Sequence, residues 1–243
     1  MREDALVMDD LAAAPLSERA FHDGLAYLTW LPDSRPPWPG IVTVHGAGSC
    51  KENHGDFGRL ACEYGWAALA YDQRGHGESL GEISPTAMDD AIAMAGVLAA
   101  SEGVDAARIC IRGSSMGGFV AIHAAAASDS IAGVIAICPP SERMLAEALR
   151  NDPLELRADR RALEPWLGEH DLREAAARLG SKPLCLLHAR GDDEVPWDYS
   201  KQLYDGAAEP RRLVVVPGGH HRSVQHDAEL QGDALRWLER NLG

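Results

Sequence analysis

A glycine-flanked serine has the clearest chemical potential in this sequence. Ser115 is the centre of Gly113-Ser114-Ser115-Met116-Gly117, which fits the pattern G-x-S-x-G. The apolar run 109–111 precedes this pattern, and a run rich in Gly and Ala, 116–127, follows it. A serine on a tight turn between a strand and a helix presents its hydroxyl above the sheet, where it can attack a carbonyl carbon. The sequence therefore predicts Ser115 as a nucleophile.

The same pattern occurs a second time, at Gly77-Glu78-Ser79-Leu80-Gly81. This copy follows the loop 72–76 instead of a strand, and Pro85 comes soon after it where a helix would be needed. We interpret it as a structural turn. The flanking elements, and not the pattern alone, therefore distinguish Ser115.

Attack on a carbonyl creates an oxyanion, which requires preorganised N–H donors. The backbone N–H of Met116, directly after the serine, is one expected donor. The apolar run 41–44 ends at His45-Gly46-Ala47-Gly48, and the N–H of Ala47 is the other expected donor. We interpret His45 as a structural residue that hydrogen bonds within this loop.

A general base and a carboxylate that orients it are expected late in the chain. Asp192 follows the apolar run 184–187 and is predicted to be the acid, with Asp193 and Glu194 as alternatives. His221 follows the run 213–216 and is predicted to be the base, with His220 as its alternative. The order Ser, Asp, His is the one expected for a nucleophile on a strand-to-helix turn of an α/β sheet. No carboxylate lies at ligand spacing from the paired histidines, so we expect no metal.

Short apolar runs alternate with amphipathic segments along the chain, which predicts an α/β fold with a doubly wound, mostly parallel sheet. The predicted strands are 41–44, 66–71, 109–111, 131–138, 184–187 and 213–216, and the predicted helices are 51–64, 86–101, 116–127, 197–208 and 224–242. Segments 5–8 and 24–31 are predicted to pair as an antiparallel hairpin at the sheet edge.

Residues 1–243 are predicted to form a single domain, interrupted at 141–180 by a small helical cap. Beneath the cap we expect an apolar pocket for a small to medium acyl group, and packing of the cap onto the domain is the alternative role of its apolar side chains. The expected lining residues are Met144, Leu145, Trp166, Leu167 and Trp197.

The formal net charge of −14 makes nucleic acid and anionic membranes unfavourable partners. Neither a signal peptide nor a stretch apolar enough to span a bilayer is evident. The five cysteines contain no C-x-x-C pair, and we expect them to be reduced in a cytoplasmic protein. A homodimer is compatible with the sequence.

From about Pro39 onward the chain resembles the α/β-hydrolase superfamily, most closely its compact serine aminopeptidase-type and dienelactone-hydrolase-like branches. The resemblance rests on segments 45–48, 72–79, 113–117, 192–196 and 219–221. The chain departs from the usual His-Gly before the acid, with His188-Ala189, which leaves the register between Asp192 and Asp193 open. In some relatives the acid follows an earlier strand, which corresponds to Glu142 here.

The resemblance implies a cofactor-free esterase, thioesterase or related acyl hydrolase that acts on a small acyl substrate. An amidase or peptidase and a C–C hydrolase are alternatives that use the same three residues. A binding module without catalytic activity is the alternative of a different class.

Overall fold

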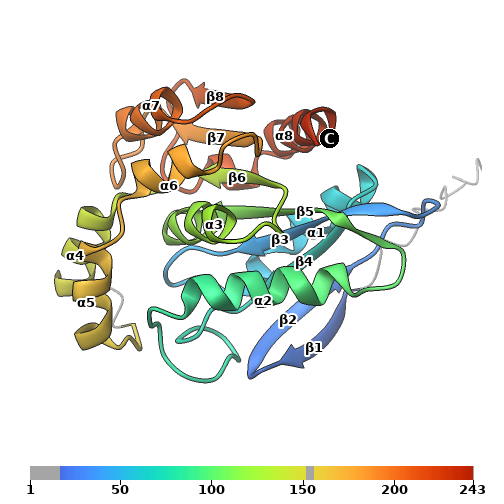
Figure 1. The fold of residues 1–243 in the computed structure, drawn as a ribbon, viewed down its shortest axis with the longest axis horizontal. Coiled ribbons are helices and arrows are strands. Elements are labelled where there is room, and N and C mark those ends of the chain that lie inside the picture. Colours follow the sequence, from blue (N-terminus) through green and yellow to red (C-terminus); the bar gives the residue numbers. More distant parts are fainter. Residues whose placement is uncertain (1–16, 152–155, 243) are drawn as a thin grey trace, which may run out of the picture.

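The computed structural model describes residues 17–151 and 156–242, and an eight-stranded sheet lies at its centre (Figure 1). The strands are β1 (Glu18–His22), β2 (Leu25–Trp30), β3 (Trp38–Val44), β4 (Ala67–Tyr71), β5 (Val104–Ser114), β6 (Gly133–Ile137), β7 (Leu184–Ala189) and β8 (Arg211–Val216). Their order in the sheet is β1-β2-β4-β3-β5-β6-β7-β8. The β1–β2 and β2–β4 pairs are antiparallel and all the others are parallel, which confirms the predicted fold class.

Helices cover both faces of the sheet (Figure 1). They are η1 (Lys51–His54), α1 (Gly55–Glu63), α2 (Ala87–Ala99), α3 (Met116–Ala127), α4 (Glu142–Asn151), α5 (Arg160–Gly168), α6 (Leu172–Arg178), α7 (Trp197–Gly206), η2 (Val224–His226) and α8 (Ala228–Asn241). One face packs against α2, α3, α6 and α7, and the other packs against α1 and α8. All side chains of β4, β6 and β7 are therefore buried, which explains why these strands are continuous apolar runs.

A hairpin lies at the edge of the sheet: β2, which falls within the predicted segment 24–31, pairs with β1 on one side and with β4 on the other. The segment 5–8, predicted as the partner of 24–31, lies outside the described residues. Asp23 and Gly24, with φ values of 47° and 77°, connect the two strands, and a D-G pair with positive φ values is typical of a tight hairpin turn.

Helices α4 and α5 pack against each other at one end of the sheet, at the left in Figure 1. Helix α6, which the sequence analysis assigned to the same cap, packs between α3 and α7 and buries Leu172, Ala175 and Ala176 in the main core. Within the described ranges, none of the helices combines the length and the apolar character that a membrane span requires.

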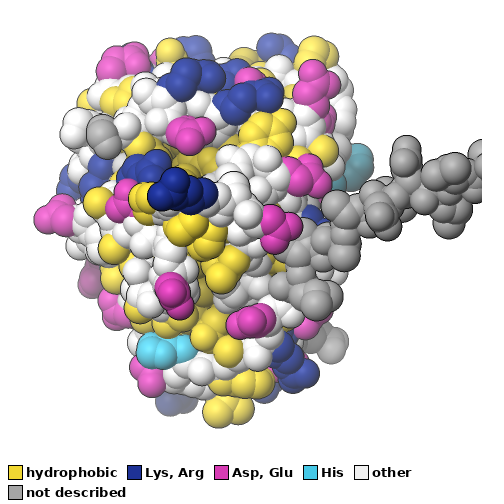
Figure 2. All heavy atoms as spheres, turned by 90° about the vertical axis from the view of Figure 1, so that its right-hand side faces the viewer, with side chains coloured by type: hydrophobic (Ala, Val, Ile, Leu, Met, Phe, Trp, Pro, Cys, Tyr) yellow, Lys and Arg dark blue, Asp and Glu magenta, His cyan; other side chains and the backbone are white. Residues whose placement is uncertain are grey.

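The face of the molecule opposite α4 and α5 carries Lys and Arg side chains interspersed with Asp and Glu (Figure 2). The excess of acidic residues therefore does not form a single-sign patch on the visible part of this face.

Candidate active site

The turn between β5 and α3 holds Ser115 in a backbone conformation that few residues other than glycine adopt. Its φ and ψ are 51° and −125°, and its N–H donates to Ile137 O at 2.8 Å. Close backbone packing surrounds the turn: a Cβ on Gly117 would lie 2.1 Å from Val44 O, and one on Gly113 would lie 2.0 Å from Gly117 O. The two glycines of the pattern are therefore steric requirements of this strained turn.

The turn presents Ser115 at the N-terminus of α3, where the helix dipole favours developing negative charge. Ser115 lines a cavity of about 460 Å³ together with His221 and Ala47. Among the described residues, none hydrogen bonds to Ser115 Oγ. The hydroxyl is thus available to a group that enters the cavity.

Asp192 and His221 are joined by a hydrogen bond of 2.7 Å between Oδ2 and Nδ1. The Asp192 side chain is fully buried and its Oδ1 also accepts the N–H groups of Glu194 and Val195, at 3.0 and 2.9 Å. Burial alone would raise the pKa of Asp192, but bonds from His188, His221 and Val195 outweigh it and hold this pKa well below its usual value. An ionised carboxylate only accepts hydrogen bonds, so Nδ1 of His221 carries the proton and Nε2 is left as the basic atom.

The alternative acids do not hydrogen bond to His221, and the alternative base does not hydrogen bond to Asp192. Asp193 is exposed, and the Glu194 side chain is 64% exposed, with Oε2 3.9 Å from His221 Nε2. Glu142 accepts the N–H of Leu172 at 3.3 Å. His220 is exposed, and its N–H donates to Ser223 Oγ. Of the carboxylates considered, Asp192 is the one within hydrogen-bond distance of His221.

His45 and Gln73 hold the loop after β3, and Ala47 in this loop lines the cavity of Ser115. His45 Nε2 accepts the N–H of Gln73 at 3.0 Å, so Nδ1 carries the proton that it donates to Gly46 O at 2.7 Å. Burial lowers the pKa of His45 to about 4, which keeps the ring neutral. No described residue accepts a hydrogen bond from the N–H of Ala47 or of Met116. Both amides are therefore free to receive an oxyanion.

A second, apolar cavity of about 120 Å³ lies between α3 and the helices α4 and α5. Ala47 and Met116 line it at one end, and Phe119, Leu145, Trp166 and Leu167 line its apolar walls. Two other predicted lining residues lie outside it. Met144 is half-buried on α4, with its N–H bonded to Ser141 Oγ, and the Trp197 ring stacks beneath the Arg190 guanidinium at 4.5 Å.

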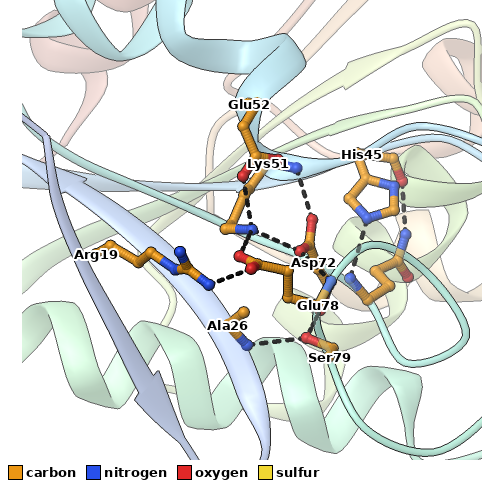
Figure 3. Close-up of polar contacts among 9 residues, drawn as sticks. Arg19, Ala26, His45, Lys51, Glu52, Asp72, Glu78 and Ser79 are labelled. Atoms are coloured by element: carbon orange, nitrogen blue, oxygen red, sulfur yellow. Dashed lines mark hydrogen bonds and ion pairs between the residues drawn. The ribbon is translucent and has the colours of Figure 1, made fainter.

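An ionic cluster missed by the sequence analysis supports the loop 72–79 (Figure 3). Lys51 Nζ is fully buried and lies 2.8 Å from a carboxylate oxygen of each of Asp72, Glu78 and Glu52. Burial would lower the pKa of Lys51, but these three carboxylates outweigh it and raise that pKa. Arg19 pairs with the second Glu78 oxygen, which ties β1 to the cluster.

Ser79, the serine of the second G-x-S-x-G pattern, belongs to the same loop (Figure 3). Its Oγ donates to Asp72 O at 2.6 Å and accepts the N–H of Ala26 at 2.9 Å. Its hydroxyl is therefore fully engaged, in agreement with the structural role predicted for this copy.

Cys138, with the acid and the base, forms the one group of three potential metal ligands that lies within the described ranges. Its Sγ and a ligand atom each of Asp192 and His221 lie within 4.8 Å of one another. Burial raises the pKa of the Cys138 thiol, so it stays protonated, whereas a metal ligand must be a thiolate. The three residues thus fit an acid–base arrangement better than a metal centre.

Known proteins resemble this chain in part of its sequence and in its fold. The family profile described as serine aminopeptidase, S33, matches residues 36–151. The uncharacterized protein YfhR of Escherichia coli (strain K12) is 25% identical over 240 residues, which span 96% of this chain and 82% of YfhR.

Two solved structures share the fold. The 2,6-dihydroxy-pseudo-oxynicotine hydrolase superposes with a TM-score of 0.75 at 22% identity, over 94% of this chain and 68% of that one. Est1E from Butyrivibrio proteoclasticus, with bound ferulic acid, superposes with a TM-score of 0.72 at 21% identity, over 93% of this chain and 98% of that one.

Proposed function

We propose that this protein is a serine hydrolase that cleaves carboxylic ester or thioester bonds of small to medium acyl groups, because it shares the fold of known hydrolases and its residues 36–151 match the serine aminopeptidase profile. One observation carries the proposal: Ser115, on its strained turn, and His221, which is hydrogen bonded to Asp192, line the same cavity. A nucleophile and an oriented base that share one cavity are the groups that acyl transfer requires.

In the proposed mechanism, His221 Nε2 takes the proton of Ser115 Oγ while Oγ bonds to the carbonyl carbon. The carbonyl oxygen becomes an oxyanion that accepts hydrogen bonds from the N–H groups of Ala47 and Met116. Asp192 stabilises the imidazolium that has formed. The C–O or C–S bond then breaks, and the imidazolium gives its proton to the leaving alcohol or thiol. Water, deprotonated by the same imidazole, hydrolyses the acyl-enzyme.

The two cavities hold different parts of the substrate in this mechanism. The leaving group must lie on the side of His221, which protonates it, so it occupies the larger cavity. The acyl group then extends past Ala47 and Met116 into the apolar cavity between α3 and the helices α4 and α5. A volume of about 120 Å³ there suits an acyl group of small to medium length.

Labelling with a fluorophosphonate probe tests the nucleophile without knowledge of the substrate. We expect the probe to attach to Ser115 in the wild-type protein and to fail with Ser115→Ala, and we expect ester hydrolysis by that variant to fall by about 10⁶-fold. Ser130→Ala, which changes an exposed serine, is the matched control and should label normally. Normal labelling or turnover of Ser115→Ala would contradict the proposal.

The bond type is tested with an ester, a thioester and an amide of the same acyl group. We expect kcat/KM to be higher for the ester or the thioester than for the amide. Faster hydrolysis of the amide, with Ser115 still labelled, would replace the esterase proposal by an amidase or peptidase.

A further inference from the structure

Two buried polar atoms without a protein partner among the described residues belong to side chains beside the apolar cavity. Tyr71 is 0% exposed and Gln73 is 4% exposed. Within the described part of the chain, neither Tyr71 Oη nor Gln73 Oε1 has a hydrogen-bond partner. Burial of a polar atom without a hydrogen-bond partner is unfavourable, so such a pair beside a ligand cavity needs an explanation.

The orientation of the Gln73 amide is set by its neighbour. Its Nε2 donates to His45 O at 2.6 Å, and a carbonyl oxygen can only accept, so nitrogen must be the atom on that side. Oε1 is therefore the acceptor that remains unpaired. Burial raises the pKa of Tyr71, so its phenol stays protonated and Oη can donate.

The two residues meet at a small hollow of about 10 Å³. Gln73, Ile83, Ser84 and Ala87 line both this hollow and the apolar cavity, so the hollow adjoins that cavity, and Tyr71 forms part of the wall of the hollow. Its volume suits one group of about the size of a water molecule, such as a hydroxyl. Asp90 also lines the hollow, but its carboxylate is already bonded to Arg74 at 2.9 and 3.0 Å.

We propose that the acyl group carries a hydroxyl, which accepts a hydrogen bond from Tyr71 Oη and donates one to Gln73 Oε1. A hydroxyl is the small group that both accepts and donates, whereas an ether or a ketone would leave Gln73 Oε1 unpaired. The inference rests on the proposed function, because it assumes that the apolar cavity receives the acyl group. It narrows the substrate class to esters or thioesters of hydroxylated acids.

The test compares ethyl esters of hydroxy acids with ethyl esters of the unsubstituted acids of the same chain length. The hydroxyl is moved along the chain, and acid release is followed by titration. We expect wild-type kcat/KM to favour one hydroxy isomer by about tenfold, the effect of about one hydrogen bond. Equal kcat/KM values for hydroxylated and unsubstituted esters at every position would overturn the inference.

Tyr71→Phe removes only the phenolic oxygen. We expect the ratio of kcat/KM for the hydroxy ester to kcat/KM for the unsubstituted ester to fall by about tenfold in this variant. Tyr27→Phe is the matched control, because Tyr27 lies opposite Tyr71 on β2 and lines neither cavity, and it should retain the preference. An equal loss of kcat/KM for both esters in Tyr71→Phe would contradict the inference.

A binding measurement separates this inference from the proposed function. Calorimetric titration of Ser115→Ala with the preferred hydroxy acid and with its unsubstituted analogue requires no turnover. We expect the hydroxy acid to bind about tenfold more tightly. Equal affinities would overturn the hydroxyl site even if Ser115 is labelled and unsubstituted esters are hydrolysed, whereas failure of labelling would contradict the proposed function itself.

Discussion

Asp192 differs from its neighbour Asp193 in surroundings and not in chemistry. Asp192→Asn retains the size of the side chain but removes the charge that stabilises the His221 imidazolium, and an amide no longer fixes the proton on Nδ1. We expect kcat for a short-chain ester to fall by about 10⁴-fold in this variant. Asp193→Asn, the matched control, changes an exposed side chain and should leave kcat unchanged. A loss in Asp193→Asn as large as in Asp192→Asn would contradict the assignment.

The sequence favoured Asp192 as the acid but left its neighbours Asp193 and Glu194 open as alternatives. Their distinction depends on the path of the loop, in which the amides of Glu194 and Val195 turn back onto Asp192 Oδ1. This turn orients Oδ2 of Asp192 toward His221, a residue that is distant in sequence. The polar residues beside the acyl cavity could not be predicted either, because the sequence indicates only that Tyr71 lies in a strand and that Gln73 lies in a loop.

At the scale of elements, the contact between α3 and the end of β3 sets the geometry of the site. A methyl group at Gly117 would meet the backbone oxygen of Val44, which cannot move aside without shifting β3. We expect Gly117→Ala to lower the free energy of unfolding by about 1–3 kcal/mol. Gly96→Ala in α2 is the matched control: nothing lies within 4 Å of its added Cβ, so it should stabilise the protein by about 0.5–1 kcal/mol. Urea unfolding measures the free-energy change in both variants, and equal changes in Gly117→Ala and Gly96→Ala would refute the steric argument.

The ionic cluster joins β1, η1 and the loop after β4. Lys51→Met leaves Asp72 buried without its cation, which we expect to lower the free energy of unfolding by about 3–5 kcal/mol. Lys201→Met breaks an exposed i,i+4 pair with Asp205 and is expected to cost about 0.3–0.5 kcal/mol. The losses of the free energy of unfolding in the two variants, measured by urea unfolding, should therefore differ several-fold. A loss in Lys51→Met as small as in Lys201→Met would show that the cluster does not stabilise the fold.

Most of the parallel strands and their helices could be predicted, because a strand buried on both faces is a short apolar run in any sequence. β1 could not be found in this way, since most of its side chains are exposed and no apolar run marks it. The ionic cluster could not be predicted from the sequence, for another reason. Its members come from segments around residues 19, 51 and 72–78, and only the folded sheet brings these together.

At the scale of the whole molecule, four buried histidines make stability depend on pH. Burial lowers the pKa of His45 and of His123 to about 4, burial beside Arg112 lowers that of His54, and burial also lowers that of His76. In the unfolded chain these rings titrate near pH 6.5. Between about pH 6.5 and 4 the unfolded chain therefore binds protons that the folded protein does not, and stability falls as the pH decreases.

The buried carboxylates affect stability at lower pH than the histidines do. The pKa values of Asp72 and Asp192 are lowered in the folded protein, so their contribution is complete above about pH 3.9 and is lost only as the pH falls further. The loss of stability between about pH 6.5 and 4 thus reports mainly the histidines. We expect the midpoint of urea unfolding to decrease steadily over this range, and an unchanged midpoint down to about pH 4.5 would contradict the prediction.

His123 allows the contribution of one ring to be isolated. Its Nε2 has no hydrogen-bond partner among the described residues, and its ring packs against Phe119 at 4.4 Å, so a leucine can replace it without leaving a polar atom unpaired. In His123→Leu the unfolded chain has one proton fewer to bind, and the midpoint should decrease less steeply as the pH is lowered. His22→Leu is the matched control: solvent reaches that exposed ring in both states, so the slope should equal that of the wild type. An unchanged slope in His123→Leu would show that this ring is not the neutral, buried base described above.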